Sequence, residues 1–159
     1  MGAWAKGVTD AKGSERGEYL PEGTYDAEVV YTDAFPKRNG GGTLCKVRLR
    51  ILATNNPEVK LQSEHDMCFN VDPSRKDVVE LQLADVRGFV MAAEDIPQDQ
   101  VTEESMYYIF DRKNDAEVGK KLRVVASTLK TKAGDPFTKY TCSTFDEAKH
   151  AALKTARAA

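Results

Sequence analysis

The alternation of residues 43–53, TLCKVRLRILA, constrains the fold of this chain more than any other feature of its sequence. Apolar and basic side chains alternate from Cys45 to Ile51. A period of two is typical of a strand with one buried face. The apolar set is Cys45, Val47, Leu49 and Ile51, and the basic set is Lys46, Arg48 and Arg50. We therefore predict a strand with an apolar inner face and an outer face that carries three cations.

Turn and capping signals divide the rest of the chain into further elements. The alternating set Tyr25, Ala27, Val29 and Tyr31 predicts a strand over 24–35, followed by the flexible connection PKRNGGG. Asp72 and Pro73 predict the first turn of an amphipathic helix that ends at about residue 93. The remaining predicted elements are a weaker strand in 60–71, a helix over 102–112 capped by Thr102, strands over 121–131 and 136–145, and a helix in 146–159.

The order of these elements predicts a mainly β fold with helices. Three strands, a helical connection and two closing strands match the connectivity of an OB-like five-stranded antiparallel barrel, with a helical insertion and a C-terminal helix. An α+β antiparallel sheet with helices on one side fits the same pattern, and alternation alone does not separate the two. The predicted organisation is a flexible N-terminal arm over 1–20, the OB-like domain over 21–145 and a helical tail over 146–159.

Charge is strongly segregated along the chain although the formal net charge is only −2 over 159 residues. Segments 37–50 and 119–140 together hold 11 basic residues and one acidic residue, which leaves 12 basic and 24 acidic residues elsewhere. Segregation of this size predicts a basic stripe on one surface of a protein whose overall composition is slightly acidic.

Several function classes lack their sequence signals. No apolar run approaches the roughly 20 residues of a membrane span, no signal peptide is recognisable, and three unpatterned cysteines indicate a reducing, cytoplasmic setting. His65 and His150 are the only histidines, and His65 lies three residues from Cys68, which in a strand places the two on opposite faces. The GGG loop lacks the GK[ST] ending of a P-loop. We predict neither an enzyme nor a metal or cofactor site.

Single-stranded nucleic-acid binding needs cations for phosphates and flat rings on which unpaired bases stack. Both kinds of side chain interleave in the basic segments. The predicted contact residues are Lys37, Arg38, Lys46, Arg48, Arg50, Lys130, Lys132, Phe137, Lys139 and Tyr140. Tyr140 is favoured over Phe137 as the stacking ring because its hydroxyl tolerates solvent. Alternation places Tyr140 opposite Phe137 and Lys139, so this choice conflicts with the position of the nearest cation.

Three segments resemble a family of small phage proteins that are commonly encoded beside phage replication and recombination genes. They are LPEGTYDAEVVYTDAF, GGGTLCKVRLRIL and VGKKLRVVASTLKTKAGDPFTKYTCSTF, and the resemblance spans residues 20–145. It implies an OB-like fold and single-stranded-DNA binding. The C-terminal KHAALKTARAA differs from the acidic tail of many single-strand binders, and residues 101–117 resemble an insertion.

These observations together predict a protein that binds single-stranded DNA without sequence specificity in bacteriophage DNA replication or recombination, in the cytoplasm of a bacterial host cell. Phage recombination or replication proteins are the protein partners to expect, and a homodimer is left open. The alternative is a protein-interaction module or inhibitor whose basic surface docks an acidic partner.

Overall fold

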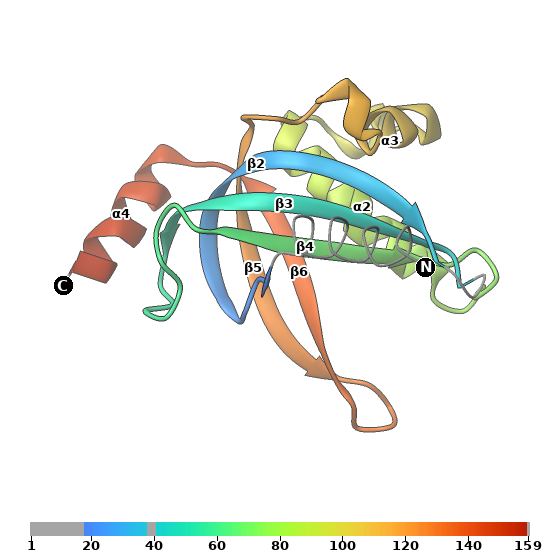
Figure 1. Cartoon of the computed structure of the whole chain (residues 1–159), viewed down its shortest axis with the longest axis horizontal. Helices are drawn as coiled ribbons and strands as arrows, with labels where there is room; N and C mark the ends of the chain where they lie inside the picture. The colour runs from blue at the N-terminus through green and yellow to red at the C-terminus, as the bar shows by residue number, and fades with distance from the viewer. Residues whose placement is uncertain (1–17, 38–40, 159) are drawn as a thin grey trace, which may run out of the picture.

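The structure is a computed structural model and describes residues 18–37 and 41–158. Six strands curl into a half-barrel, and three helices pack around it (Figure 1). The strands are β1 (Glu18–Tyr19), β2 (Gly23–Pro36), β3 (Thr43–Thr54), β4 (Glu64–Val71), β5 (Lys121–Lys130) and β6 (Pro136–Thr144). The helices are α2 (Val79–Glu94), α3 (Glu103–Ile109), α4 (Glu147–Ala158) and the 3-10 turns η1 (Gln98–Gln100) and η2 (Arg112–Asn114).

The strand order across the sheet is β1-β4-β3-β2-β5-β6. β1 pairs with β4 in parallel, and all other neighbours are antiparallel. The prediction of a mainly β, barrel-like fold is confirmed. The prediction of five antiparallel strands is wrong, because the sheet has six strands and one of its pairs is parallel. β1 falls in the predicted arm, where two residues are too few to show a period; residues 1–17 of that arm lie outside the described residues.

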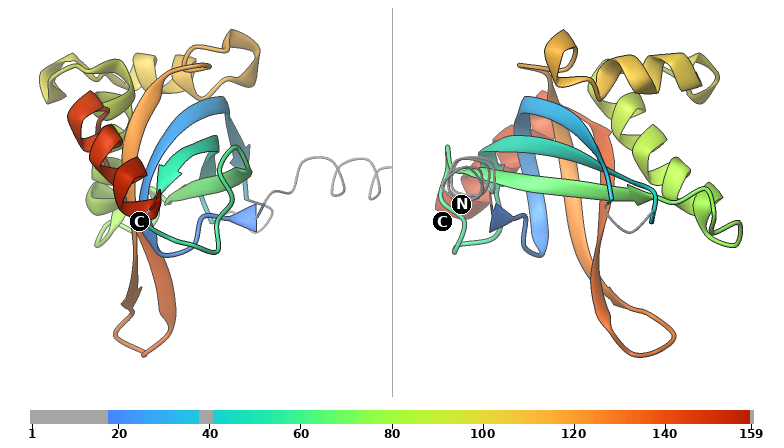
Figure 2. Two further views of the ribbon diagram at one scale, coloured as in Figure 1. Left: turned by 90° about the vertical axis from the view of Figure 1, so that its left-hand side faces the viewer. Right: turned by 45° about the vertical axis from the view of Figure 1, so that its right-hand side comes forward.

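Apolar side chains from the inner faces of the strands form one core with α2. Phe89 of α2 lies between two other rings, 6.5 Å from Phe69 of β4 and 5.8 Å from Phe110, measured between ring centroids. Tyr140 of β6 meets Phe69 edge-on at 6.2 Å. β4 and β6 are separated by three strands in the sheet, so this contact shows how strongly the sheet curls (Figure 2).

A bulge at Val30 changes the face on which the second half of β2 presents its side chains. Pairing with β3 shifts register between Val29 and Tyr31, so Tyr31 lies opposite Arg48 on the outer face. Thr32 takes the inner position instead and donates a hydrogen bond to the carbonyl of Ile109. The prediction that Tyr31 shares a face with Val29 is therefore wrong, because one extra residue inverts the alternation.

The helices begin close to their predicted capping residues, with one exception. Thr102 caps α3 in a capping box with Ser105, as predicted. α2 begins at Val79 and not at Pro73, because the Asp72 carboxylate accepts hydrogen bonds from the backbone and hydroxyl of Ser74 in a local turn. None of the helices in the described residues is long and apolar enough to cross a membrane.

Candidate nucleic-acid interface

Lys46 and Arg48 lie on the outer face of β3, as the alternation predicted, but they are paired with a carboxylate. Arg48 Nε donates to Asp66 Oδ1 at 2.9 Å, and Lys46 Nζ lies 3.4 Å from Asp66 Oδ2. Asp66 is directly opposite Arg48 in the β3–β4 register. The side chains of both cations are about one-tenth exposed. Asp66 offsets only one of these two positive charges, so Lys46 and Arg48 form a largely buried ion-pair cluster, and their contact with phosphates stays a prediction.

Tyr31 gathers three cations around its ring. The distances to the ring centroid are 5.4 Å from Lys46 Nζ, 5.1 Å from Arg48 Cζ and 4.1 Å from Arg112 Cζ. Such contacts contribute about 0.5–1 kcal/mol each at exposed sites and more where water is excluded. Arg112 comes from the segment 101–117, so the predicted insertion adds a cation to the outer face. The sequence held no signal for this contact, because it depends on the bulge in β2.

Arg50 is the most exposed of the three β3 cations, and it also has acidic partners. Its guanidinium lies 3.2 Å from Glu28 Oε1 and 3.4 Å from Glu64 Oε2. Both carboxylates face Arg50 across the β2–β3 and β3–β4 registers. Each of the three predicted cations of β3 therefore has a carboxylate neighbour supplied by an adjacent strand.

The β5–β6 hairpin carries cations of a different kind. It projects beyond the body of the sheet, and every residue from 128 to 139 is exposed (Figure 1). Within the described part of the chain, no ion pair involves Lys130, Lys132 or Lys139. Burial raises the pKa of Asp85, and the nearby Lys139 opposes part of that rise. The three predicted lysines of this segment therefore lie together on one exposed hairpin.

The two predicted stacking rings of β6 have different environments. Phe137 is 44% exposed and shares the outer face with Lys139, whereas Tyr140 is 7% exposed and packs on Phe69. Burial raises the pKa of the Tyr140 hydroxyl above its ordinary value. The choice of Tyr140 as the solvent-facing ring is therefore wrong: its side chain belongs to the core, and Phe137 is the available ring.

The described ends of the β2–β3 connection, at residue 37 and at residues 41–42, lie away from the hairpin tip (Figure 1). Lys37 is exposed there, and its backbone N–H donates to the Gly42 carbonyl at 2.9 Å. Gly42 has a φ of +90°, and a Cβ at this position would lie 2.1 Å from the carbonyl oxygen of Val71. This glycine is therefore sterically required. Arg38, the other predicted cation of the loop, lies outside the described residues.

The described residues hold no group of three or more metal-ligating side chains. His65 points to the inner face of β4 and Cys68 to the outer face, as the spacing predicted. Burial raises the pKa of the Cys45 and Cys68 thiols to about 11 and that of Cys142 to about 12, so all three are protonated near neutral pH.

A buried carboxyl that sequence reasoning missed lies where α2 meets the start of β5. Glu117 is fully buried, and Lys120 Nζ lies 3.5 Å from its Oε2 atom. Burial, together with the neighbouring Glu94 carboxylate, raises the pKa of Glu117 to about 8. The pKa of Glu94 is lowered by its neighbours Glu117 and Lys120. This cluster joins the end of α2 to the segment that leads into β5.

Comparison with known proteins gives no family to which the chain can be assigned. A scan of the sequence against known protein families finds no match, and a search of curated proteins finds no significant relative. Inferences about function therefore depend on the geometry described above.

Proposed function

We propose that this protein binds single-stranded DNA without sequence specificity, with the β5–β6 hairpin as its principal contact. The observation that carries the proposal is the exposure of this hairpin, with three lysines that make no ion pair among residues 18–37 and 41–158 and with Phe137 on the same face as Lys139. Lysines neutralise phosphates irrespective of sequence, and an exposed ring offers a platform for any base.

The strand order supports the same proposal. β4, β3, β2, β5 and β6 follow one another in the order expected for an OB-like barrel that is open between its third and fifth strands, with α2 in the connection. OB folds bind oligonucleotides across their second and third strands and the loops 1–2 and 4–5. In this chain these features are the outer faces of β3 and β4, the loop at 37–42 and the tip of the hairpin at 131–135.

The two cationic regions have different roles in this proposal. Lys130, Lys132 and Lys139 contact phosphates, and Phe137 stacks on a base with a contribution of about 1–3 kcal/mol. On the outer face of β3, Asp66 holds Arg48 in place beside Tyr31. These residues shape the protein surface along which the bound DNA strand runs. The resemblance to phage proteins encoded beside replication and recombination genes suggests the process that this binding serves.

A salt titration of binding to a fluorescent, unstructured oligonucleotide tests the proposal. We expect log affinity to fall linearly with log salt, because each phosphate contact on a single strand adds about −0.7 to the slope. Replacement of Lys130, Lys132 and Lys139 by alanine is expected to reduce the slope by about 2. The control replaces three exposed lysines elsewhere, Lys60, Lys76 and Lys154, and should change the slope much less.

Two outcomes would overturn the proposal. The first is an affinity for the oligonucleotide that does not change with salt concentration. The second is an equal reduction of the salt slope in the hairpin and control variants. If no oligonucleotide binds, the exposed lysines would instead favour the alternative of docking on an acidic protein surface.

A further inference from the structure

We propose that the apolar groove between α2 and α3 receives the β5–β6 hairpin of a second copy of this chain. The contact joins two different surfaces and therefore links copies head to tail. In the single chain the groove is an apolar hollow that is open to solvent. The hairpin exposes apolar side chains that the core of the same chain does not cover.

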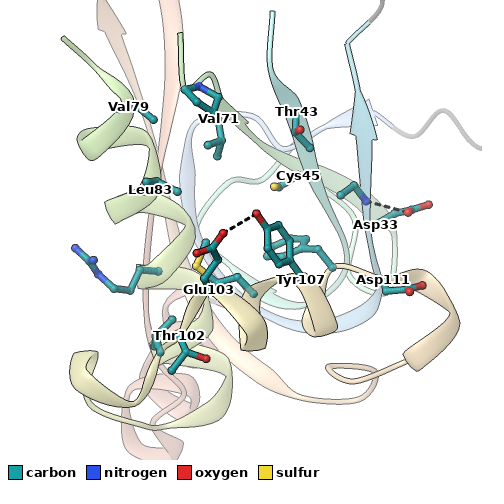
Figure 3. A pocket seen from close by; sticks show the side chains of 16 residues that line it. Asp33, Thr43, Cys45, Val71, Val79, Leu83, Thr102, Glu103, Tyr107 and Asp111 are labelled. Carbon is teal, nitrogen blue, oxygen red and sulfur yellow. Dashed lines mark hydrogen bonds between the residues drawn. The ribbon is translucent and has the colours of Figure 1, made fainter. Parts of the chain in front are cut away.

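The groove has a volume of about 760 Å³ and is open on one side. Its walls come from α2, from α3 and from the ends of β2, β3 and β4, and its apolar lining includes Cys45, Val71, Val79, Leu83, Met106 and Phe110. Figure 3 shows the side chains of Glu103 and Tyr107 turned toward each other, where the Tyr107 hydroxyl donates to Glu103 at 2.9 Å. The groove therefore combines apolar walls with a carboxylate on its lining.

The hairpin presents an apolar pair of matching size. Leu129 and Phe137 lie directly opposite each other in the β5–β6 register and share the outer face. They are 42% and 44% exposed, and no other element of the described chain covers them. The pair therefore offers an apolar contact surface that the single chain leaves in solvent. Two such side chains fit within a groove of this volume.

The two surfaces carry opposite charge. Asp33, Glu103 and Asp111 line the groove against one cation, Arg87, which gives a formal charge of −2. The hairpin carries Lys130, Lys132 and Lys139 against Asp135, which gives +2. Complementary charges of this kind set the orientation of a contact and speed its formation. This complementarity selects the hairpin of a second copy as the occupant of the groove.

One chain cannot fill its own groove in this way. α3 and the hairpin tip lie at opposite ends of the molecule in all three views (Figures 1 and 2). A contact between two different surfaces of identical copies leaves one groove and one hairpin of each dimer unused, so it extends into open chains or closes into a ring. The contact is small, and small interfaces are weak, so association should appear at high concentration.

Sedimentation velocity of the full chain, without nucleic acid, tests this proposal. We expect the weight-average mass to rise above the 17.6 kDa of one copy between about 10 µM and about 1 mM, and to fall back at high salt. Phe137→Ser in the hairpin and Leu83→Asp in the groove should each raise the dissociation constant at least about tenfold. Glu103→Lys reverses one charge of the groove and serves as a second groove variant if Leu83→Asp folds poorly.

A mixture of variants distinguishes this contact from a symmetric one. Phe137→Ser lacks a working hairpin and Leu83→Asp lacks a working groove, so an equimolar mixture should form dimers and nothing larger. Leu81→Asp is the matched control, because Leu81 lies on the same helix and is 69% exposed but does not line the groove. It should associate like the unmodified chain.

Three results would overturn the proposal: a monomer at every concentration, association that the groove and hairpin variants leave unchanged, and no dimers in the mixture. Because nucleic acid is absent, these results are independent of whether the hairpin also binds DNA. If both proposals hold, an oligonucleotide should compete with self-association, since both use Phe137 and the hairpin lysines.

Discussion

His150 of α4 lies 3.0 Å from Asp26 of β2, measured from Nδ1 to Oδ2. Asp26 is fully buried, and it also accepts two hydrogen bonds from Arg123, at 2.8 Å from Nε and 3.0 Å from Nη2. The ring of His150 lies 5.1 Å from that of Phe145 between centroids. His150 therefore holds the C-terminal helix to the sheet.

The first prediction concerns this attachment. His150→Ala should leave the sheet folded but raise hydrogen exchange in residues 147–156, because α4 loses its polar contact with Asp26. The loss of one hydrogen bond to a buried charge should cost about 1.5–3 kcal/mol of stability. Hydrogen exchange and thermal unfolding measure the two effects. Lys154→Ala, at an exposed position of the same helix, should change neither, and unchanged exchange in His150→Ala would contradict the assignment.

The second prediction compares two arginines of β3. Arg48→Ala should lower the free energy of unfolding by about 1–3 kcal/mol, because it removes the 2.9 Å ion pair between Arg48 Nε and the buried Asp66 carboxylate. Arg50→Ala should cost at most about 1 kcal/mol, because its ion pairs are partly exposed. Urea denaturation of both variants measures the difference. Equal losses would mean that the Asp66 pair is energetically no different from the surface pairs.

The faces of single strands could be predicted from the sequence wherever alternation is unbroken. The inner and outer sets of β3 are correct, because neighbouring residues of a strand must point to opposite sides. The Thr102 cap of α3 is also correct, since capping depends on residues within one turn. These features are local, so the chain encodes them within a few positions.

Contacts between distant segments could not be predicted in this way. The bulge at Val30 moves Tyr31 to the outer face, and only the folded chain places Arg112 above its ring. Alternation placed Lys46 and Arg48 on the outer face but could not show that Asp66 of the next strand forms ion pairs with both. The structure therefore differs most from the sequence prediction at residues of the candidate site that contact partners from other strands.

The third prediction concerns pH. The pKa of Glu117 is about 8 in the folded protein, against an ordinary value of 4.5, because the carboxyl is buried and lies beside the Glu94 carboxylate, and the nearby Lys120 only partly offsets this rise. The folded state therefore holds a proton that the unfolded state releases, so stability should fall as pH rises from about 4.5 to about 8. The lowered pKa of Glu94 acts in the opposite direction, but at pH values below this window.

Glu117→Gln removes the titration and retains a polar side chain of similar shape. Its stability should vary less between pH 5 and about 8 than that of the unmodified chain, and it should be relatively more stable at the upper end. Glu104→Gln, at an exposed position, is the control and should preserve the original pH dependence. Chemical denaturation at several pH values gives the comparison, and parallel curves for Glu117→Gln and the unmodified chain would exclude Glu117 as the source.

The last prediction separates the two rings of β6. Tyr140→Ala should lower stability by about 3–5 kcal/mol, because it removes a large side chain that packs on Phe69 in the core. Phe137→Ala should change stability by only about 0.5 kcal/mol, because its ring is exposed and has no core contact to lose. Thermal and urea unfolding of both variants measure these effects.

The same two variants should differ in the opposite way in binding. Phe137→Ala should weaken oligonucleotide affinity by about 1–3 kcal/mol, or roughly 5- to 150-fold, because a stacked base loses its platform. The loss should be similar at low and high salt, since stacking is largely non-ionic, whereas Lys139→Ala should reduce the salt slope. Binding is measured at nanomolar protein, where a weak contact between copies does not contribute. Normal affinity in Phe137→Ala would remove stacking on this ring from the proposed mode of binding and leave the lysines as the only contacts of the hairpin.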